Sequence, residues 1–182
     1  MPYPIEPLSQ DHDRAAFSCG TSLLDTFLHQ RVGQFVDRDL TRAFVMVDPD
    51  GTAAAAGKKT IVGYDTLSSS GLDYEEMSDA LRHRVPRRMR VGVTLLGYLA
   101  VDGRYKGQGR GKDLLYDALY RTLRVSEEVA TRAVIVDAVD ADAVSFYAHH
   151  ALRRFADDSN RFFYTMEDMR RLFARTRSGT PL

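Results

Sequence analysis

The stretch that decides the fold of this chain is LGYLAVDGRYKGQGRGKDLLYDAL, which occupies residues 96–119. Its apolar beginning predicts a strand that ends at Val101, and the apolar spacing of its second half predicts an amphipathic helix. Between the two lie Gly107, Gly109 and Gly111. A glycine turn that leads into a helix gathers unpaired backbone amides at one point, where the helix dipole adds partial positive charge. The stretch therefore predicts a turn that binds phosphate or pyrophosphate.

Three cationic side chains, Lys106, Arg110 and Lys112, would add charge to this turn. Two well-known nucleotide-binding motifs do not fit it. A P-loop requires serine or threonine after its Gly-Lys pair, but Asp113 stands there. A dinucleotide-binding turn requires a third glycine, and Lys112 stands in its place. Because glycine spacing alone is a weak signal, an ordinary surface turn is the alternative interpretation.

The composition favours one folded domain over residues 1–182. The chain is 44% apolar and 27% charged with no net charge, which excludes disordered and collagen-like classes. Its one cysteine, Cys19, can form neither an internal disulfide nor a cysteine-based zinc site, and it indicates a reducing, cytoplasmic compartment. No signal peptide and no membrane helix are predicted. The histidines and carboxylates show no metal-ligand spacing, so we expect no metal.

Apolar periodicity predicts the other elements. A helical stripe starts at Leu24, with Thr21 or Ser22 as its cap, and includes Phe35. Asp140 is predicted to cap a later helix. A turn-rich insert around Ala53 separates two strands of a hairpin. The remaining predicted strands and helices are strands 3–5, 41–47, 60–67, 93–101, 132–136, 152–155 and 162–166, and helices 74–81, 140–149 and 167–175.

Residues 106–111 resemble the [QR]-x-x-G-x-[GA] pyrophosphate loop of the GNAT superfamily of acyl-coenzyme A-dependent N-acyltransferases. The sequence Phe146-Tyr147-x-x-His-Ala-Leu resembles the later F-Y-x-x-x-G-F of the same superfamily. Lys106 departs from the usual glutamine or arginine, and it lacks the planar fork of arginine. Ala151 stands where glycine is usual, which suggests a different turn. The resemblance implies an α/β (α+β) fold: a mixed, mostly antiparallel sheet flanked by helices and splayed at the central strand near Val101.

One branch of that superfamily matches further. Phe17-Ser18-Cys19-Gly20, followed by Leu23-Leu24-Asp25-x-Phe27-Leu28, resembles the N-terminal signature of the acetyltransferase toxins of bacterial toxin–antitoxin pairs. Members of this branch acetylate the α-amine of aminoacyl-tRNA and stop translation. The resemblance therefore implies aminoacyl-tRNA as substrate, acetyl-CoA as acyl donor and a ribbon–helix–helix antitoxin as partner. Since dimers are common in the branch, it also suggests a homodimer.

The resemblance also assigns site residues. It assigns coenzyme binding to the end of the central strand and to the glycine turn. The residues are Leu99, Ala100, Val101, Lys106, Gly107, Gln108, Gly109, Arg110, Gly111 and Lys112. The resemblance makes Tyr147 the general acid that protonates the departing thiolate, for which a phenol of pKa near 10 is suited. The alternative for Tyr147 is an ordinary half-buried aromatic residue. His149 and His150 are candidate bases, but such a pair more often lies at a helix end.

Five arginines crowd into nine residues of a basic loop: Arg82, Arg84, Arg87, Arg88 and Arg90. Such a run is either a solvated loop or a patch that contacts the phosphates of an RNA acceptor stem. Further arginines around the last predicted hairpin could extend that patch: Arg153, Arg154 and Arg161.

Two other functions stay open from the sequence. One is acetylation of a small amine or of a protein N-terminus, although no cluster of carboxylates near the predicted site indicates an acidic substrate pocket. The other is a coenzyme-binding interaction module without turnover, against which the retained Tyr147 argues.

Overall fold

The computed structural model describes residues 3–51 and 57–177. The chain divides into two compact units: unit 1 contains Met1–Ser68 and Gly97–Ala118, and unit 2 contains Ser69–Leu96 and Leu119–Leu182. The insert around Ala53 lies outside the described residues. Three elements run through both units: β4 (Lys59–Leu72), β5 (Val91–Val101) and α4 (Arg110–Val125).

Unit 1 contains an antiparallel run of strands in the order β1-β3-β4, with β2 parallel to the start of β4. Its further strands are β1 (Ile5–Pro7), β2 (His12–Asp13) and β3 (Arg42–Asp48). The hairpin of β3 and β4 is the one predicted from the sequence, whereas the edge strand lies at Ile5–Pro7 rather than at residues 3–5. β5 is the neighbour of β4 on the side away from β3. A hydrogen bond from the Tyr98 amide to the Thr66 hydroxyl, 3.1 Å long, joins the two strands in unit 1.

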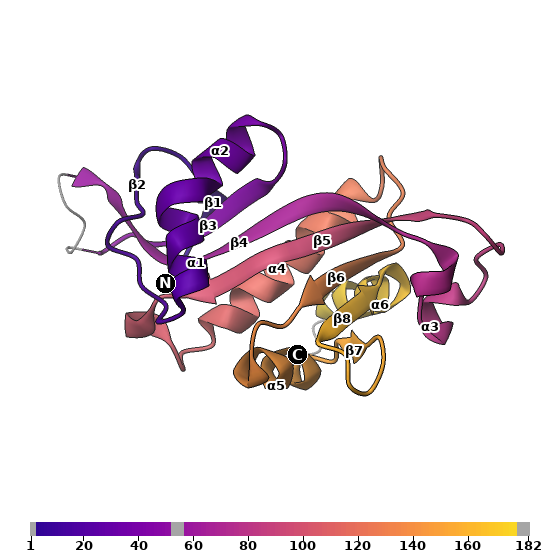
Figure 1. The fold of residues 1–182 in the computed structure, drawn as a ribbon. Helices are drawn as coiled ribbons and strands as arrows, with labels where there is room; N and C mark the ends of the chain where they lie inside the picture. The colour runs from indigo at the N-terminus through magenta and orange to yellow at the C-terminus, as the bar shows by residue number, and fades with distance from the viewer. Residues whose placement is uncertain (1–2, 52–56, 178–182) are drawn as a thin grey trace. The chain divides into compact units, whose positions relative to one another are not determined.

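Neighbouring residues of β4 in unit 1 face opposite layers, as successive strand residues do. The helical segment of unit 1 is formed by α1 (Ser22–Thr26), the π-helical turn η1 (Phe27–Arg31) and α2 (Val32–Asp37) (Figure 1). Tyr64 packs in the core with buried residues of this segment. Gly63 faces α4, and a Cβ there would lie 2.6 Å from Cδ1 of Leu114. The missing side chain therefore lets α4 pack directly against the sheet.

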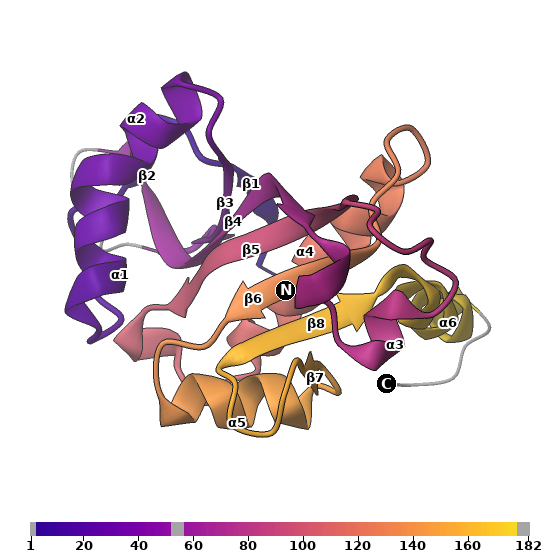
Figure 2. The same ribbon diagram turned by 45° about the vertical axis from the view of Figure 1, so that its right-hand side comes forward.

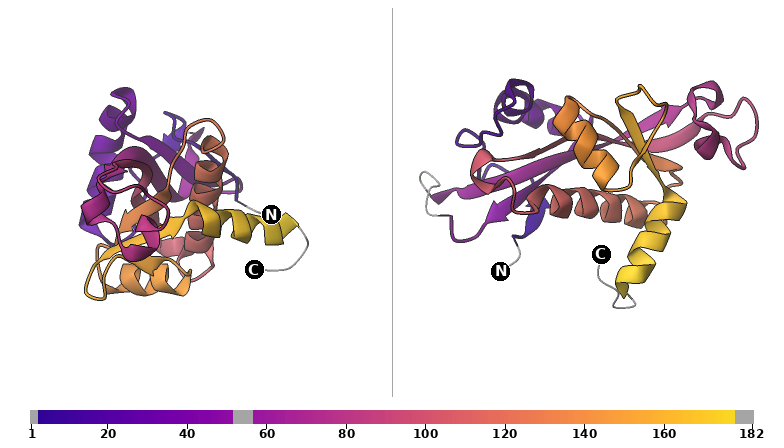
Figure 3. Two further views of the ribbon diagram at one scale, coloured as in Figure 1. Left: turned by 90° about the vertical axis from the view of Figure 1, so that its right-hand side faces the viewer. Right: turned by 90° about the horizontal axis from the view of Figure 1, so that it is seen from below.

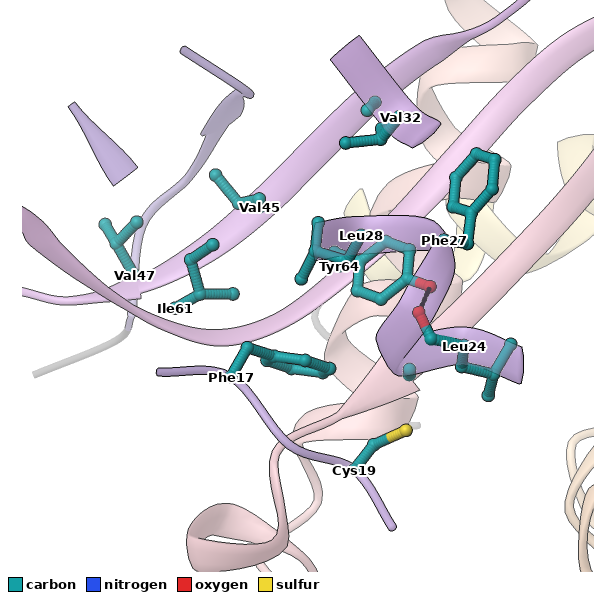
Figure 4. Close-up of a cluster of buried hydrophobic side chains, with 12 residues drawn as sticks. Phe17, Cys19, Leu24, Phe27, Leu28, Val32, Val45, Val47, Ile61 and Tyr64 are labelled. Atoms are coloured by element: carbon teal, nitrogen blue, oxygen red, sulfur yellow. Dashed lines mark hydrogen bonds between the residues drawn. The ribbon is translucent and has the colours of Figure 1, made fainter. Parts of the chain in front are cut away.

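The core of unit 1 confirms most of the predicted helical stripe. Leu24, Phe27, Leu28 and Val32 are buried (Figure 4). Phe35 is 38% exposed and does not belong to the core. The π-helical turn explains the difference, because an extra residue in one turn rotates the residues that follow it. Thr21 is the N-cap residue, but its side chain makes no capping hydrogen bond.

Unit 2 holds strands in the order β5-β6-β8-β7 (Figure 2). The strands that follow β5 are β6 (Ala133–Asp137), β7 (Arg153–Arg154) and β8 (Arg161–Thr165). β6 is parallel to β5 and antiparallel to β8, so the predicted mixed, mostly antiparallel sheet is confirmed. The ladder between β5 and β6 joins residues 94–96 to 134–136, whereas β5 itself continues to Val101.

The helices of unit 2 are η3 (Tyr74–Glu76), α3 (Asp79–Arg82), α5 (Ala141–His149) and α6 (Met166–Arg177), and α6 follows directly from β8 (Figure 3). The single helix predicted over residues 74–81 is wrong. Asp73 caps η3 in a capping box with Glu76, and Ser78 then begins a separate short helix. Among the described residues no helix is long and apolar enough to cross a membrane.

Replacing Tyr64 by phenylalanine tests the core of unit 1. The Tyr64 hydroxyl is fully buried and donates to the Leu24 carbonyl at 2.9 Å (Figure 4). Its loss removes a buried hydrogen bond, although the Leu24 carbonyl still accepts from the Phe27 amide, so we expect the free energy of unfolding to fall by about 0.5–1.5 kcal/mol in urea titrations. Tyr98→Phe is the control, because it also removes one hydroxyl but keeps the stacking of the ring on Phe27. We expect its free energy of unfolding to stay close to that of the wild type. Equal stability of Tyr64→Phe and wild type would contradict this role.

Candidate active site

The glycine turn, residues 106–111, lies in unit 1 after the end of β5 and runs into α4, whose first two residues are Arg110 and Gly111. The short helix η4 (Gly103–Tyr105) precedes it. Gly107 and Gly109 have φ of 74° and 79°, in the left-handed region that favours glycine, and a Cβ on either would meet no atom within 4 Å. The first amides of a helix have no acceptor within it. Open space beside these amides fits an anionic group such as the pyrophosphate of a nucleotide.

Asp102, which the sequence analysis did not single out, anchors this turn. Its side chain is buried and accepts four hydrogen bonds: from the Arg104 amide at 2.9 Å, from Arg104 Nε at 2.8 Å and Nη2 at 2.9 Å, and from the Ser18 amide at 3.0 Å. Burial raises the pKa of Asp102, but the donors from Arg104 and Ser18 outweigh burial and hold that pKa below its usual value. The carboxylate is therefore ionised at neutral pH.

The cationic side chains predicted to bind the coenzyme each contact the protein itself. Lys106 Nζ donates to the Cys19 carbonyl at 2.7 Å. The Arg110 guanidinium lies 4.3 Å from the centre of the Tyr3 ring, and Lys112 Nζ lies 5.4 Å from the centre of the Tyr116 ring. An anion at this turn would therefore be held chiefly by backbone amides and the helix dipole.

Tyr147 lies on α5 in unit 2. Asp140 caps this helix as predicted, by accepting from the Ala143 amide at 2.8 Å. Tyr147 is 5% exposed, and its ring centre lies 5.8 Å from that of Phe162. Burial first, and the charge of Asp140 second, raise the pKa of Tyr147 far above its usual value. The phenol therefore stays protonated at neutral pH, as a proton donor must.

The end of α5 accounts for the other residues of this motif. His149 and His150 lie at the C-terminal end of the helix, where the His150 amide donates to the Phe146 carbonyl at 3.2 Å. Ala151 has φ of 62°, in the left-handed region. The backbone of Ala151 therefore has the left-handed conformation that glycine favours at the end of a helix. The φ angle gives no sign of the different turn that the change from glycine to alanine suggested.

The five arginines of the basic loop divide into two groups. Arg82 donates to the carbonyls of Tyr74 and Glu75 at 3.1 and 2.8 Å, and Arg90 pairs with Asp73 at 2.7 Å. These two side chains therefore hold the loop and its neighbours together.

The other three, Arg84, Arg87 and Arg88, have exposed side chains and no ion pair within the part of the chain that the structure describes. Arg132, the residue before β6, donates to the His83 carbonyl at 2.7 Å and so holds the backbone of the loop. The loop thus presents three exposed cations, unpaired among residues 3–51 and 57–177, on a backbone held by hydrogen bonds.

The arginines predicted to extend this patch are engaged within the protein and are therefore less available to phosphates. Arg153 pairs with Asp168 at 2.6 Å, and Arg161 pairs with Asp137 at 2.8 Å. Arg154 donates to the Asp157 carbonyl at 2.6 Å. Within residues 3–51 and 57–177, no group of three or more histidine, cysteine or acidic side chains is arranged to hold a metal ion.

A glycine turn between a strand and a helix, on a mixed sheet flanked by helices, defines a GNAT-like acyltransferase fold. No protein-family model matches the chain. The chain is 30% identical over 134 residues to the probable toxin TacT of Sinorhizobium fredii. The matched residues make up 73% of this chain and 70% of that protein. The chain is also 30% identical over 165 residues to the tRNA-acetylating toxin of Mycobacterium tuberculosis, which covers 91% and 93%. The chain belongs to this family of tRNA-acetylating toxins.

Solved structures share the fold. A tyrosine-to-phenylalanine mutant of KacT superposes with a TM-score of 0.85 at 25% identity, over 95% of this chain and 100% of that one. AtaT complexed with acetyl-methionyl-tRNAfMet superposes with a TM-score of 0.81 at 24% identity, over 93% and 98%. An AtaT mutant toxin bound to acetyl-CoA and the C-terminus of the antitoxin AtaR superposes with a TM-score of 0.77 at 22% identity, over 95% of this chain and 99% of that one.

Proposed function

We propose that this protein transfers an acetyl group from acetyl-CoA to the α-amine of aminoacyl-tRNA and thereby blocks translation as the toxin of a toxin–antitoxin pair. The observation that carries the proposal is the identity of 30% to a tRNA-acetylating toxin across 91% of the chain. The open glycine turn of unit 1 supports it, because this turn fits the pyrophosphate of the coenzyme. A ribbon–helix–helix antitoxin, a homodimer and a cytoplasmic location belong to the same proposal.

The coenzyme turn and the end of β5 are proposed to hold the acyl donor. The amides of Gly107, Gln108, Gly109, Arg110 and Gly111 would bind the pyrophosphate, and the main chain of Leu99, Ala100 and Val101 would bind the pantetheine arm. Bound acetyl-CoA supplies a thioester, which is an activated acetyl group with a thiolate leaving group. Lys106 and Lys112 add positive charge near the turn, but their ammonium groups contact the Cys19 carbonyl and the Tyr116 ring.

Tyr147 is proposed to donate the proton that the departing thiolate takes up. Its buried phenol is protonated at neutral pH, so it can donate a proton but cannot deprotonate the incoming amine before attack. After the thiolate has taken the proton, the phenolate takes one from the attacking nitrogen, which must lose a proton as the amide forms. His149 and His150 lie at a helix end, and we assign neither of them as the base. The α-amine of a peptide titrates near pH 8, and an esterified amino acid is less basic still. Much of the substrate amine is therefore already neutral and can attack without a strong base.

The proposed reaction is tested with radiolabelled acetyl-CoA, total charged tRNA and purified protein. Deacylated tRNA is the control, because it has the same backbone without the α-amine. We expect label on charged tRNA alone. Label on neither RNA, with coenzyme binding measured separately, would refute the proposed acceptor and direct the search to small amines and protein N-termini.

Tyr147→Phe is expected to lower kcat while the dissociation constant of acetyl-CoA stays the same. Loss of a general acid typically reduces turnover by roughly 10²- to 10⁴-fold. The matched control is Tyr164→Phe, because Tyr164 is also buried in unit 2 but lies on β8, outside the motif. Unchanged kcat for Tyr147→Phe would remove Tyr147 from the mechanism.

Charge reversal of Arg87 and Arg88 together tests the arginine patch. Both side chains are exposed and unpaired among the described residues, so the double glutamate variant should keep its fold. We expect tRNA binding to weaken about tenfold or more and its salt dependence to become less steep, because phosphate contacts release fewer counterions. The control reverses Arg170 and Arg171, an adjacent exposed pair on α6. Equal tRNA affinity for both double variants would refute the patch.

A further inference from the structure

The turn that leads from β5 to α4 is tied to a distant part of unit 1. The connecting segment is residues 17–20, which precede α1. Asp102 accepts from the Ser18 amide at 3.0 Å, across 84 positions of sequence, and the Gly103 amide donates to the Ser18 carbonyl at 2.8 Å. Lys106 then donates to the Cys19 carbonyl at 2.7 Å. Three hydrogen bonds therefore join the start of the turn to residues 17–20.

Residues 17–20 are themselves fixed. Phe17 is 1% exposed, and its ring packs edge-on against Tyr64 with centres 5.5 Å apart (Figure 4). Asp25 of α1 accepts from the Cys19 amide at 2.8 Å and from the Ser18 hydroxyl at 3.2 Å. The segment is therefore a rigid support that joins the core and α1 to the turn.

Asp102 is the centre of this support. A buried carboxylate is stable only when donors replace its lost hydration, and bonds to an ionised group are stronger than neutral ones. All four of its donors belong either to Ser18 or to Arg104, at the beginning of the turn. The carboxylate thus fixes the direction in which the chain leaves β5. The lowered pKa of Asp102 agrees with this arrangement.

We propose that Asp102 is a positioning residue for coenzyme binding, which holds the glycine turn in its pyrophosphate-binding conformation through Ser18 and Arg104. Lys106 completes the same tie by bonding to the Cys19 carbonyl, and so acts on the pyrophosphate mainly through the shape of the turn. The proposal rests on the proposed function, because the pyrophosphate belongs to acetyl-CoA.

Asp102→Asn tests the proposal, since it keeps the size of the side chain and removes its charge. Two acyl donors are compared by equilibrium binding: acetyl-CoA, and acetyl-pantetheine, which has the same thioester and arm but no pyrophosphate. We expect acetyl-CoA to bind about tenfold more weakly, as for one lost charge-assisted bond. Acetyl-pantetheine should bind as it does to the wild type. An equal loss for both donors, or no loss for either, would overturn the proposal.

Asp168→Asn in unit 2 is the matched control, because Asp168 also accepts from an arginine, Arg153, and from the Thr165 hydroxyl. It should bind both donors as the wild type does. If Asp102→Asn does not fold, Arg104→Met is measured instead, because it removes two of the donors to Asp102 at a residue that is not assigned to the coenzyme. A selective loss of acetyl-CoA binding supports the proposal, and unchanged binding overturns it. Wild-type protein that binds both donors equally would show instead that the coenzyme turn itself is wrongly assigned, and the positioning role would fall with it.

Discussion

The buried carboxylate of Asp102 is the constraint on which the rest of unit 1 depends. A desolvated negative charge must be surrounded by donors, and these come from Arg104 and from the Ser18 amide. Satisfying it fixes three things at once: where β5 ends, how the chain enters the glycine turn, and where the segment before α1 lies. The first turn of α4 and its unpaired amides are placed as a consequence.

In the proposed function, the glycine turn would hold an anion chiefly through the geometry of its backbone amides and less through flexible charged side chains. Its lysines and its arginine contact a carbonyl, the Asp113 carboxylate and aromatic rings of the protein, whereas a Cβ at Gly107 or Gly109 would meet no atom within 4 Å. Oriented amides need no reorganisation when an anion binds, so a rigid turn is an efficient binding site. Unit 2 uses charge differently, since Arg84, Arg87 and Arg88 extend from a held loop as solvated cations. Such side chains suit a long, uniform phosphate backbone.

The buried phenol of Tyr147 and the proposed substrate are chemically consistent with each other. Burial keeps this phenol protonated, so no phenolate is present to deprotonate an ammonium group before attack, and the residue regains its lost proton only from the nitrogen that has attacked. An enzyme that depends on such an acid requires an amine that arrives largely neutral. The α-amine of an aminoacyl ester has this property, whereas the side chain of lysine, with a pKa near 10.4, does not.

The sequence by itself determined the features that depend on residues close together in the chain. These are the strand, glycine turn and helix around Gly109, the cap at Asp140 and the β3–β4 hairpin. Only the tertiary structure decided that Asp102 meets Ser18 and that Arg82 and Arg90 bond to their neighbours, while the arginines between them form no ion pair with the residues that the structure describes. The physical reason is that hydrogen bonding and burial depend on the partner that folding brings near, and periodicity in the sequence carries no record of a partner 84 positions away.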